Sequence, residues 1–255
     1  MVEKHKKLVV GNWKMHMDLQ QASVFVHHLD RATESKDDTE IVLCPPFTAL
    51  QPITKEIDIH KFRLGAQNLH YQDEGAFTGE VSGPMLKNLV HYVIVGHSER
   101  RKYFNETDDV VARKMSAAIR NELRPILCVG ENLYERQEQH TNRVIHDQLV
   151  TGLTMLTANE VAEIVVAYEP VWAVGSGDIA KPDQIKTALA TIRKTIVELF
   201  GKNTAQKVRL LYGGSVTPDL VHDYFKLKDL DGFLIGGVSL NWQQFAEIIE
   251  ITQAA

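Results

Sequence analysis

The sequence predicts an α/β protein of the (β/α)8 barrel class, with eight parallel strands inside a ring of outer helices. Eight short apolar runs recur along the 255 residues, and their starts span 225 residues in seven intervals. The spacing is therefore about 32 residues per unit, close to the roughly 30 that one βαβ unit needs. The runs are continuous rather than alternating, as in Leu8–Val10 and Ile164–Val166, which is typical of strands buried on both faces.

The strands and helices follow one another in a regular order, with no linker or composition break. We therefore expect residues 1–255 to form one barrel domain. The longest expected helix, Lys181–Phe200, repeats apolar residues at three- and four-residue spacing. Two further segments with helical spacing are Thr107–Asn121 and Asn142–Leu156. The expected strands are Lys7–Trp13, Glu40–Pro46, Phe62–Asn68, Tyr92–Ser98, Arg124–Glu131, Glu163–Pro170, Val208–Ser215 and Gly232–Gly237.

A doubly wound sheet is the main alternative fold. It normally has fewer strands and carries a glycine-rich dinucleotide fingerprint after its first strand. The first expected strand here runs instead into Gly11–Met15, with the sequence GNWKM, which lacks that fingerprint. The barrel therefore accounts better for the sequence.

Composition excludes several classes of partner. The net charge is −5, from 28 basic and 33 acidic residues, whereas duplex-binding proteins usually carry a basic surplus. No stretch approaches the roughly 20 apolar residues of a membrane span, and the apolar run after the basic first residues is too short for a signal peptide. Cys44 and Cys128 each lie in an apolar run and are expected to be buried thiols. We expect a cytoplasmic protein with no nucleic-acid or membrane partner.

Polar residues gather where the expected strands end, which is where barrels carry their active sites. Each one alone has an ordinary structural explanation, but their convergence on one mouth favours a functional site. They are Asn12, Lys14, His97, Glu99, Glu169, and the turns Gly213–Ser215 and Gly236–Gly237. Glycine-rich turns after the last two strands suit a phosphate group, because backbone N–H groups can approach it closely.

These residue types match one chemical task, the removal of a proton next to a carbonyl group. A carboxylate such as Glu169 is a suitable base, and a general base contributes about 10²–10⁴ in rate. The reaction builds negative charge on the carbonyl oxygen, which needs a nearby cation or hydrogen-bond donors. Lys14 can supply the cation, and His97 and Asn12 can supply the donors. The sequence shows no metal-ligand cluster, and we expect no cofactor.

At these residues the chain resembles the triosephosphate isomerase family, and the resemblance extends along its whole length. Seven motifs carry it, in the family's order and at the expected strand ends. They are Gly11–Met15, Gly75–Glu80, Val95–Arg101, Cys128–Glu131, Ala167–Ala173, Tyr212–Ser215 and Gly236–Gly237. The family's fold is the TIM barrel.

The resemblance implies an isomerisation of dihydroxyacetone phosphate and glyceraldehyde 3-phosphate through an enediolate. Glu169 would move the proton between the two carbons, and His97 would act as a neutral electrophile and proton shuttle at the oxygens. Lys14 would stabilise the oxyanion and the phosphate, Asn12 would hydrogen-bond the oxygen, and Glu99 would be a buried partner of Lys14. The resemblance further implies that phosphate is held by backbone N–H groups of Gly175, Ser215, Gly236 and Gly237.

Two loops complete the implied site. Pro170–Ala180 resembles the family's lid. Val174 of the lid and Leu234 from outside it would close over Glu169, exclude water and raise the basicity of its carboxylate. The lid departs from the family's usual pattern at Asp178–Ile179, which puts its kinetics in question but touches no implied catalytic residue. The loop Asp73–Ser82 resembles one that enters a second subunit, which implies a homodimer.

Two other functions remain open from the residues. A different phosphate-binding barrel acting on a sugar phosphate would share the turns after the last two strands. It would have no reason to keep Asn12, Lys14, His97 and Glu169 together. A non-catalytic barrel that binds a metabolite or a protein would tolerate loss of the base or the lysine, and both are present.

Overall fold

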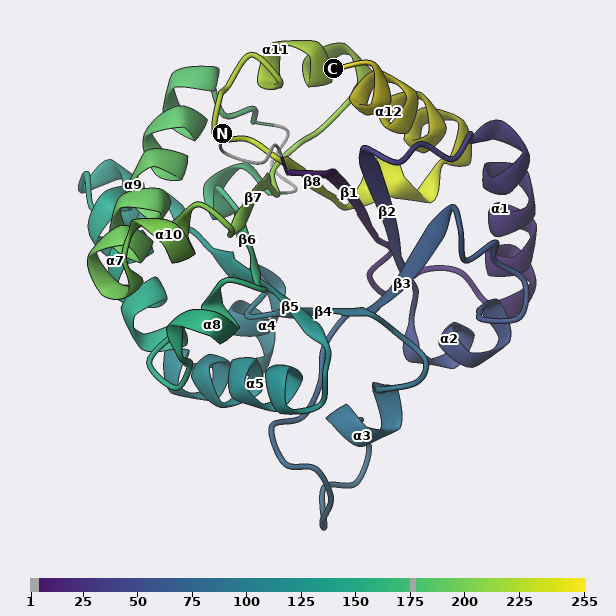
Figure 1. Ribbon diagram of the computed structural model, residues 1–255, viewed down its shortest axis with the longest axis horizontal. Coiled ribbons are helices and arrows are strands. Elements are labelled where there is room, and N and C mark those ends of the chain that lie inside the picture. Colours follow the sequence, from purple (N-terminus) through teal and green to yellow (C-terminus); the bar gives the residue numbers. More distant parts are fainter. Residues whose placement is uncertain (1–4, 175–177) are drawn as a thin grey trace.

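The computed structural model describes residues 5–174 and 178–255. In this part of the chain, eight parallel strands close into a barrel in which each strand pairs with its neighbours in sequence and β1 pairs with β8 (Figure 1). The expected fold class is therefore confirmed. The strands are β1 Lys7–Asn12, β2 Thr39–Cys44, β3 Phe62–Ala66, β4 Tyr92–Val95, β5 Arg124–Val129, β6 Val165–Tyr168, β7 Arg209–Tyr212 and β8 Gly232–Ile235.

Helices surround the barrel on its outside (Figure 1). The three segments expected from their spacing are α5, α7 and α9, and Pro182 opens α9 as its first residue. The helices are α1 Leu19–Ala32, α2 Phe47–Ile53, α3 Gly83–Leu86, α4 Ser98–Phe104, α5 Asp108–Arg120, α6 Leu133–Gln137, α7 Thr141–Gly152, α8 Ala158–Val161, α9 Pro182–Phe200, α10 Lys202–Ala205, α11 Pro218–Tyr224 and α12 Trp242–Ala254. Short 3₁₀ turns follow β6 and β8 at Val171–Ala173 and Gly237–Leu240.

The continuous apolar runs are explained by two separate layers of packing. Alternate strand residues point to opposite faces, so Leu8 and Val10 lie in the cluster that fills the barrel, together with Cys44 and Cys128. Val9 lies in the larger cluster between the strands and the helices. Both faces of β1 are therefore buried, which is why its sequence shows no polar alternation.

Several expected strands end earlier than their apolar runs do. The run expected at Tyr92–Ser98 forms a strand only over Tyr92–Val95, because Gly96 has a positive φ of 70° that turns the chain. His97 then caps α4, and its side chain accepts a hydrogen bond from the N–H of Glu99. The turn therefore moves His97 from the strand to the start of a helix, where its ring reaches the barrel mouth.

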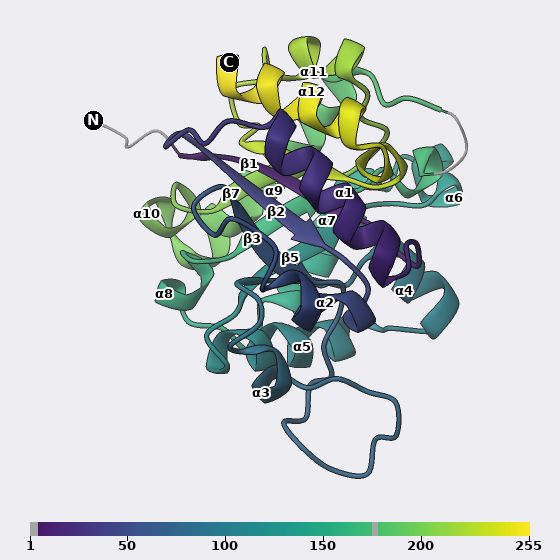
Figure 2. The same ribbon diagram turned by 90° about the vertical axis from the view of Figure 1, so that its right-hand side faces the viewer.

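The loop between β3 and α3 projects beyond the ring of helices (Figure 2). Its residues 72–80 are all exposed, and Phe77 near its tip is 42% exposed. The base of the loop is fixed by Asp73, whose carboxylate accepts hydrogen bonds from Arg120 at 2.9 Å and from Asn121 at 3.0 Å.

In residues 5–174 and 178–255, no helix is long and apolar enough to cross a membrane.

Candidate active site

A cavity of about 530 Å³ opens at the carboxyl ends of the strands. The sequence-predicted residues Asn12, Lys14, His97, Glu99, Glu169, Ser215, Gly236 and Gly237 all line it. Val174 and Leu234 line the same cavity. Gly175, which was also expected at the phosphate, lies outside the described residues. The barrel therefore brings together residues from five strand ends that are up to 225 positions apart in the sequence.

Glu169 follows β6 and is 2% exposed. One of its carboxylate oxygens, Oε1, lies 2.9 Å from His97 Nε2, and the other, Oε2, accepts the N–H of Ser98 at 2.9 Å. Burial raises the pKa of the Glu169 carboxyl, but the charge and hydrogen bond of His97 and the Ser98 N–H outweigh it, so the pKa is lowered. Burial therefore acts in the expected direction on the basicity of Glu169, but the net pKa is lowered in this arrangement because both carboxylate oxygens are paired.

The hydrogen bonds of His97 define the position of its proton. Nδ1 accepts the N–H of Glu99 at 3.3 Å, so in the neutral ring the proton is on Nε2, which donates to Glu169. Burial lowers the pKa of His97, yet the Glu169 carboxylate raises it more, and the net pKa is raised. The charge state of the imidazole therefore depends on whether Glu169 remains beside it.

Lys14 reaches across the mouth from the turn after β1. Its backbone has a positive φ of 53°, and its N–H donates to Asn12 Oδ1 at 3.1 Å, which holds this unusual turn. Its ammonium lies 2.6 Å from Glu99 Oε1. The expectation that Glu99 is buried is wrong, since its side chain is 38% exposed. Glu99 reaches Lys14 at the open rim of the cavity.

Glycines lie where side chains of the cavity pass close to the turns. A Cβ on Gly213 would lie 3.0 Å from Glu169 Cγ, and a Cβ on Gly236 would lie 3.2 Å from Lys14 Cε. A Cβ on Gly237 would contact nothing within 4 Å among the described residues, so its backbone faces open space. These turns leave room for an anion beside the Lys14 ammonium.

The contacts of Glu131 were not predicted from the sequence, although Glu131 lies in the motif Cys128–Glu131. Glu131 is fully buried after β5 and accepts hydrogen bonds from Tyr168 Oη at 3.2 Å and Trp172 Nε1 at 2.9 Å. Arg136 Nη1 lies 3.3 Å from the same carboxylate. Glu131 therefore fixes the residues on both sides of Glu169. Its position directly after an apolar strand was the available signal.

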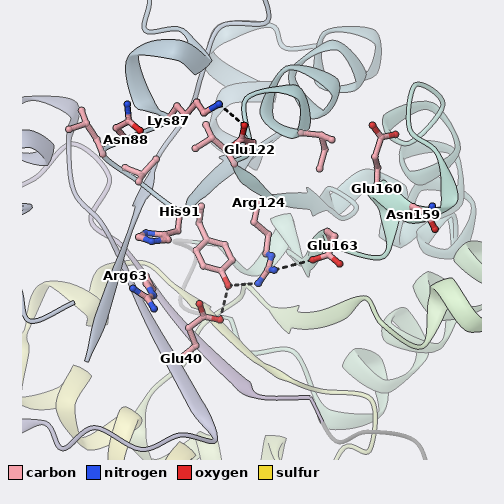
Figure 3. A pocket seen from close by; sticks show the side chains of 15 residues that line it. Glu40, Arg63, Lys87, Asn88, His91, Glu122, Arg124, Asn159, Glu160 and Glu163 are labelled. Atoms are coloured by element: carbon pink, nitrogen blue, oxygen red, sulfur yellow. Dashed lines mark hydrogen bonds and ion pairs between the residues drawn. The ribbon is translucent and has the colours of Figure 1, made fainter. Parts of the chain in front are cut away.

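A second, larger cavity of about 750 Å³ lies at the opposite end of the barrel. Here polar side chains at the starts of the strands pair with one another (Figure 3). Tyr92 Oη donates to Glu40 Oε2 at 2.7 Å, and Arg124 Nη2 donates to Glu163 at 3.1 Å. Arg209, which is not part of this lining, donates from Nη1 to Glu40 at 2.9 Å. The larger cavity is lined by none of the residues that the sequence predicted for the functional site.

The described residues contain no group of three or more His, Cys, Asp or Glu side chains placed to hold a metal ion. The titratable side chains that line the carboxyl-end cavity are Lys14, His16, His97, Glu99 and Glu169. Side chains of these types can take part in acid–base and electrostatic chemistry.

Comparison with known proteins identifies the family. The family model described as "Triosephosphate isomerase" matches residues 7–252. A protein named triosephosphate isomerase from Carboxydothermus hydrogenoformans is 44% identical over 96% of this chain and 98% of its own length. Proteins of the same name from Moorella thermoacetica and Clostridium perfringens are 45% and 42% identical, over 97% and 95% of this chain and 99% and 98% of theirs. The chain belongs to the triosephosphate isomerase family.

Proposed function

We propose that this protein interconverts dihydroxyacetone phosphate and D-glyceraldehyde 3-phosphate, a step of glycolysis and gluconeogenesis. The observation that carries the proposal is the meeting of Glu169, His97, Lys14 and Asn12 in one cavity bordered by glycine turns. A barrel enzyme that acts on a different sugar phosphate would need the phosphate-binding turns after β7 and β8, but it would not need these four side chains together. The family membership and the names of the relatives support the same reaction.

Glu169 is the proposed base. Its carboxylate takes a proton from the carbon next to the carbonyl, and the electron pair of the broken C–H bond forms an enediolate. The resulting carboxylic acid returns the proton to the neighbouring carbon, while the hydroxyl proton passes from one substrate oxygen to the other by way of the His97 imidazole, so atoms and charge balance without a cofactor. Because both carboxylate oxygens are paired with His97 and Ser98, Glu169 must leave these partners to reach the substrate.

His97, Asn12 and Lys14 are the proposed electrophilic groups. When Glu169 leaves, the proton on His97 Nε2 becomes free to be donated to a substrate oxygen. Departure of the carboxylate also removes the main cause of the raised pKa of His97, which favours a neutral imidazole during the reaction. Hydrogen-bond donors of this kind contribute about 10²–10³ each in rate where they face a developing oxyanion.

The phosphate is proposed to lie against the turns after β7 and β8. The backbone N–H groups of Ser215, Gly236 and Gly237 are the proposed donors, with the Lys14 ammonium beside them. Gly175 is the remaining proposed donor. The open space at Gly237 and the close approach of Lys14 to Gly236 support this placement.

We further propose a cytoplasmic homodimer of single-domain chains. The exposed loop 73–82, with Phe77 at its tip and its base fixed by Asp73, suits insertion into a second copy. Cys44 and Cys128 are both buried free thiols, which suits a reducing compartment.

A coupled assay on the purified protein tests the proposed reaction in both directions. We expect turnover of each triose phosphate without added metal or cofactor. A chelator should not reduce the rate. Absence of turnover with both substrates would favour the non-catalytic barrel. Turnover of a larger sugar phosphate with none of the triose phosphates would favour the other phosphate-binding enzyme.

A further inference from the structure

The backbone beyond β5 lies directly against the backbone of the proposed base. A Cβ placed on Gly130 would lie 1.8 Å from the carbonyl oxygen of Glu169. The N–H of Glu169 also donates to the carbonyl of Val129 at 2.8 Å. The main chain of Glu169 therefore rests on residues 129–130, and any displacement there is passed to the base.

One side chain holds both polar groups of Gly130. Gln148 Oε1 accepts the Gly130 N–H at 2.8 Å, and Gln148 Nε2 donates to the Gly130 carbonyl at 3.3 Å. Gly130 is buried and lies just past Val129, the last residue of β5. Buried backbone groups need partners, and here a single amide from α7 takes the place that a sheet neighbour would fill.

Gln148 projects from a helix that is packed on the same strand. Its neighbours Ile145, Leu149 and Gly152 are the buried residues of α7. A Cβ on Gly152 would make an ordinary contact with Leu127 of β5 at 3.4 Å, so the helix lies close to the strand. The amide of Gln148 thus ties Gly130 to a rigid element rather than to a mobile loop.

We infer that Gln148 is a positioning residue, which holds the base Glu169 in register by clamping Gly130. The inference rests on the proposed role of Glu169 as the base. Catalytic groups must be held within about 0.5 Å of their productive positions, and a 1 Å misplacement can cost about 10²-fold in rate. Without the clamp, the N–H and carbonyl of Gly130 lose their partners, and the segment under Glu169 is free to shift.

A purely structural role for Gln148 makes a different prediction. In that case the amide only satisfies two buried backbone groups, and its loss lowers the melting temperature without changing turnover by the folded protein. The two roles are therefore separated by kinetics measured well below the unfolding temperature, together with a measurement on the Glu169 backbone itself.

The test uses the full chain with Gln148→Met, which keeps the length of the side chain and removes both hydrogen bonds. We expect kcat to fall about 5–50-fold, within the range that small misplacements cost, with KM changed less than about twofold because the phosphate turns are untouched. Amide hydrogen exchange should become faster at Gly130 and Glu169. Gln148→Glu keeps the acceptor for the Gly130 N–H, and it should recover part of the lost turnover.

Gln253→Met is the matched control. Gln253 is 9% exposed on α12, and its Nε2 donates to the Glu34 carbonyl at 3.0 Å, away from the cavity. It should lower the melting temperature while leaving kcat at the wild-type value. If Gln148→Met does not fold, Gln148→Glu carries the test, with reduced kcat and faster Glu169 exchange expected.

Wild-type kcat in a folded Gln148→Met protein, or unchanged exchange at Glu169, would overturn the inference. A parallel loss of kcat in Gln253→Met would do the same, since the effect would then follow stability. Failure of the proposed function is recognised separately, because wild-type protein would then lack isomerase activity or Glu169→Gln would retain it.

Discussion

His97 Nε2 and Glu169 Oε1 lie 2.9 Å apart, so the proposed electrophile and the proposed base are hydrogen-bonded to each other. The pair lowers the pKa of the Glu169 carboxyl and raises that of His97, although burial acts in the opposite direction on each. Catalysis then requires the pair to separate, and separation makes Glu169 a stronger base and lowers the pKa of His97, which favours its neutral form. The arrangement therefore keeps the base inactive until substrate competes for its partners.

Replacing Glu169 with Gln keeps the size of the side chain and removes the carboxylate. We expect kcat to fall by at least about 10²–10⁴, the contribution of a general base, with the circular dichroism spectrum unchanged. The control is Glu247→Gln on an exposed face of α12, which should retain full turnover. Turnover above about a tenth of wild type in Glu169→Gln would show that another group is the base.

Replacing Lys14 with Met removes the ammonium and keeps the aliphatic stem. Both affinity and turnover should fall, because the charge faces the phosphate of the bound substrate and the oxyanion of the transition state. Lys14→Arg should restore little, since a planar, forked guanidinium does not replace a compact ammonium. Steady-state kinetics check both variants, and near-normal values for Lys14→Arg would contradict the geometry.

Replacing Gly236 with Ala places a methyl group 3.2 Å from Lys14 Cε. The end of a lysine can move, so the fold should survive, but the ammonium and the phosphate N–H groups would no longer fit together. We expect KM to rise about 3–10-fold, equivalent to about 0.7–1.4 kcal/mol, with a smaller change in kcat. Inhibition by inorganic phosphate should weaken in parallel. An unchanged phosphate inhibition constant would place the phosphate elsewhere.

The loop 73–82 should make the protein a C₂ homodimer, the commonest oligomer. Sedimentation at micromolar concentration should give the mass of two chains. Phe77→Asp should shift the equilibrium towards the monomer, because it places a charge where an apolar ring would be buried. Glu74→Gln, an exposed change in the same loop, serves as the control. A wild-type monomer with full activity would refute the dimer.

Glu40, at the end of the barrel opposite the candidate active site, should make the free energy of unfolding depend on pH in acid. Burial raises its pKa, but the Tyr92 hydrogen bond and the Arg209 charge lower it below the ordinary value of 4.5. A lowered folded-state pKa means that the unfolded chain binds more protons in acid, so the stabilisation is present above about pH 4.5 and is lost as the pH falls through the folded pKa.

Glu40→Gln should therefore lower the free energy of unfolding by about 1–3 kcal/mol at pH 7 and make it less dependent on pH below 4.5. Urea unfolding at several pH values measures both effects. Glu122→Gln, which removes an exposed ion pair with Lys87, should change neither by more than about 1 kcal/mol. An equal acid dependence in Glu40→Gln and wild type would assign the effect to other groups.

The sequence predicted the barrel and the convergence of Asn12, Lys14, His97 and Glu169, because parallel strands deliver their last residues to one end. It could not predict the pairing of His97 with Glu169, which depends on side-chain rotamers after the Gly96 turn. The role of Gln148 could not be predicted from the sequence, since glutamine is a common residue on an amphipathic helix. Its contact with Gly130 follows only from how α7 packs on β5. The pairing of Glu99 with Lys14 was expected, but the sequence could not show that the two side chains meet at the open rim of the cavity, where Glu99 is partly exposed.

The ring of Tyr92 lies in the apolar filling of the barrel, and its hydroxyl is held by Glu40 and Arg209 at the ends of the strands farthest from Glu169. The barrel interior is thus filled with side chains, and the cavity that Glu169 lines lies at the other end. We therefore expect solvent hydrogen that exchanges with the proton held on Glu169 to enter through the cavity that substrate uses. Exchange of the intermediate's proton with solvent and release of product would then use the same opening of the cavity. Conditions that slow this opening should therefore slow isotope exchange and product release together.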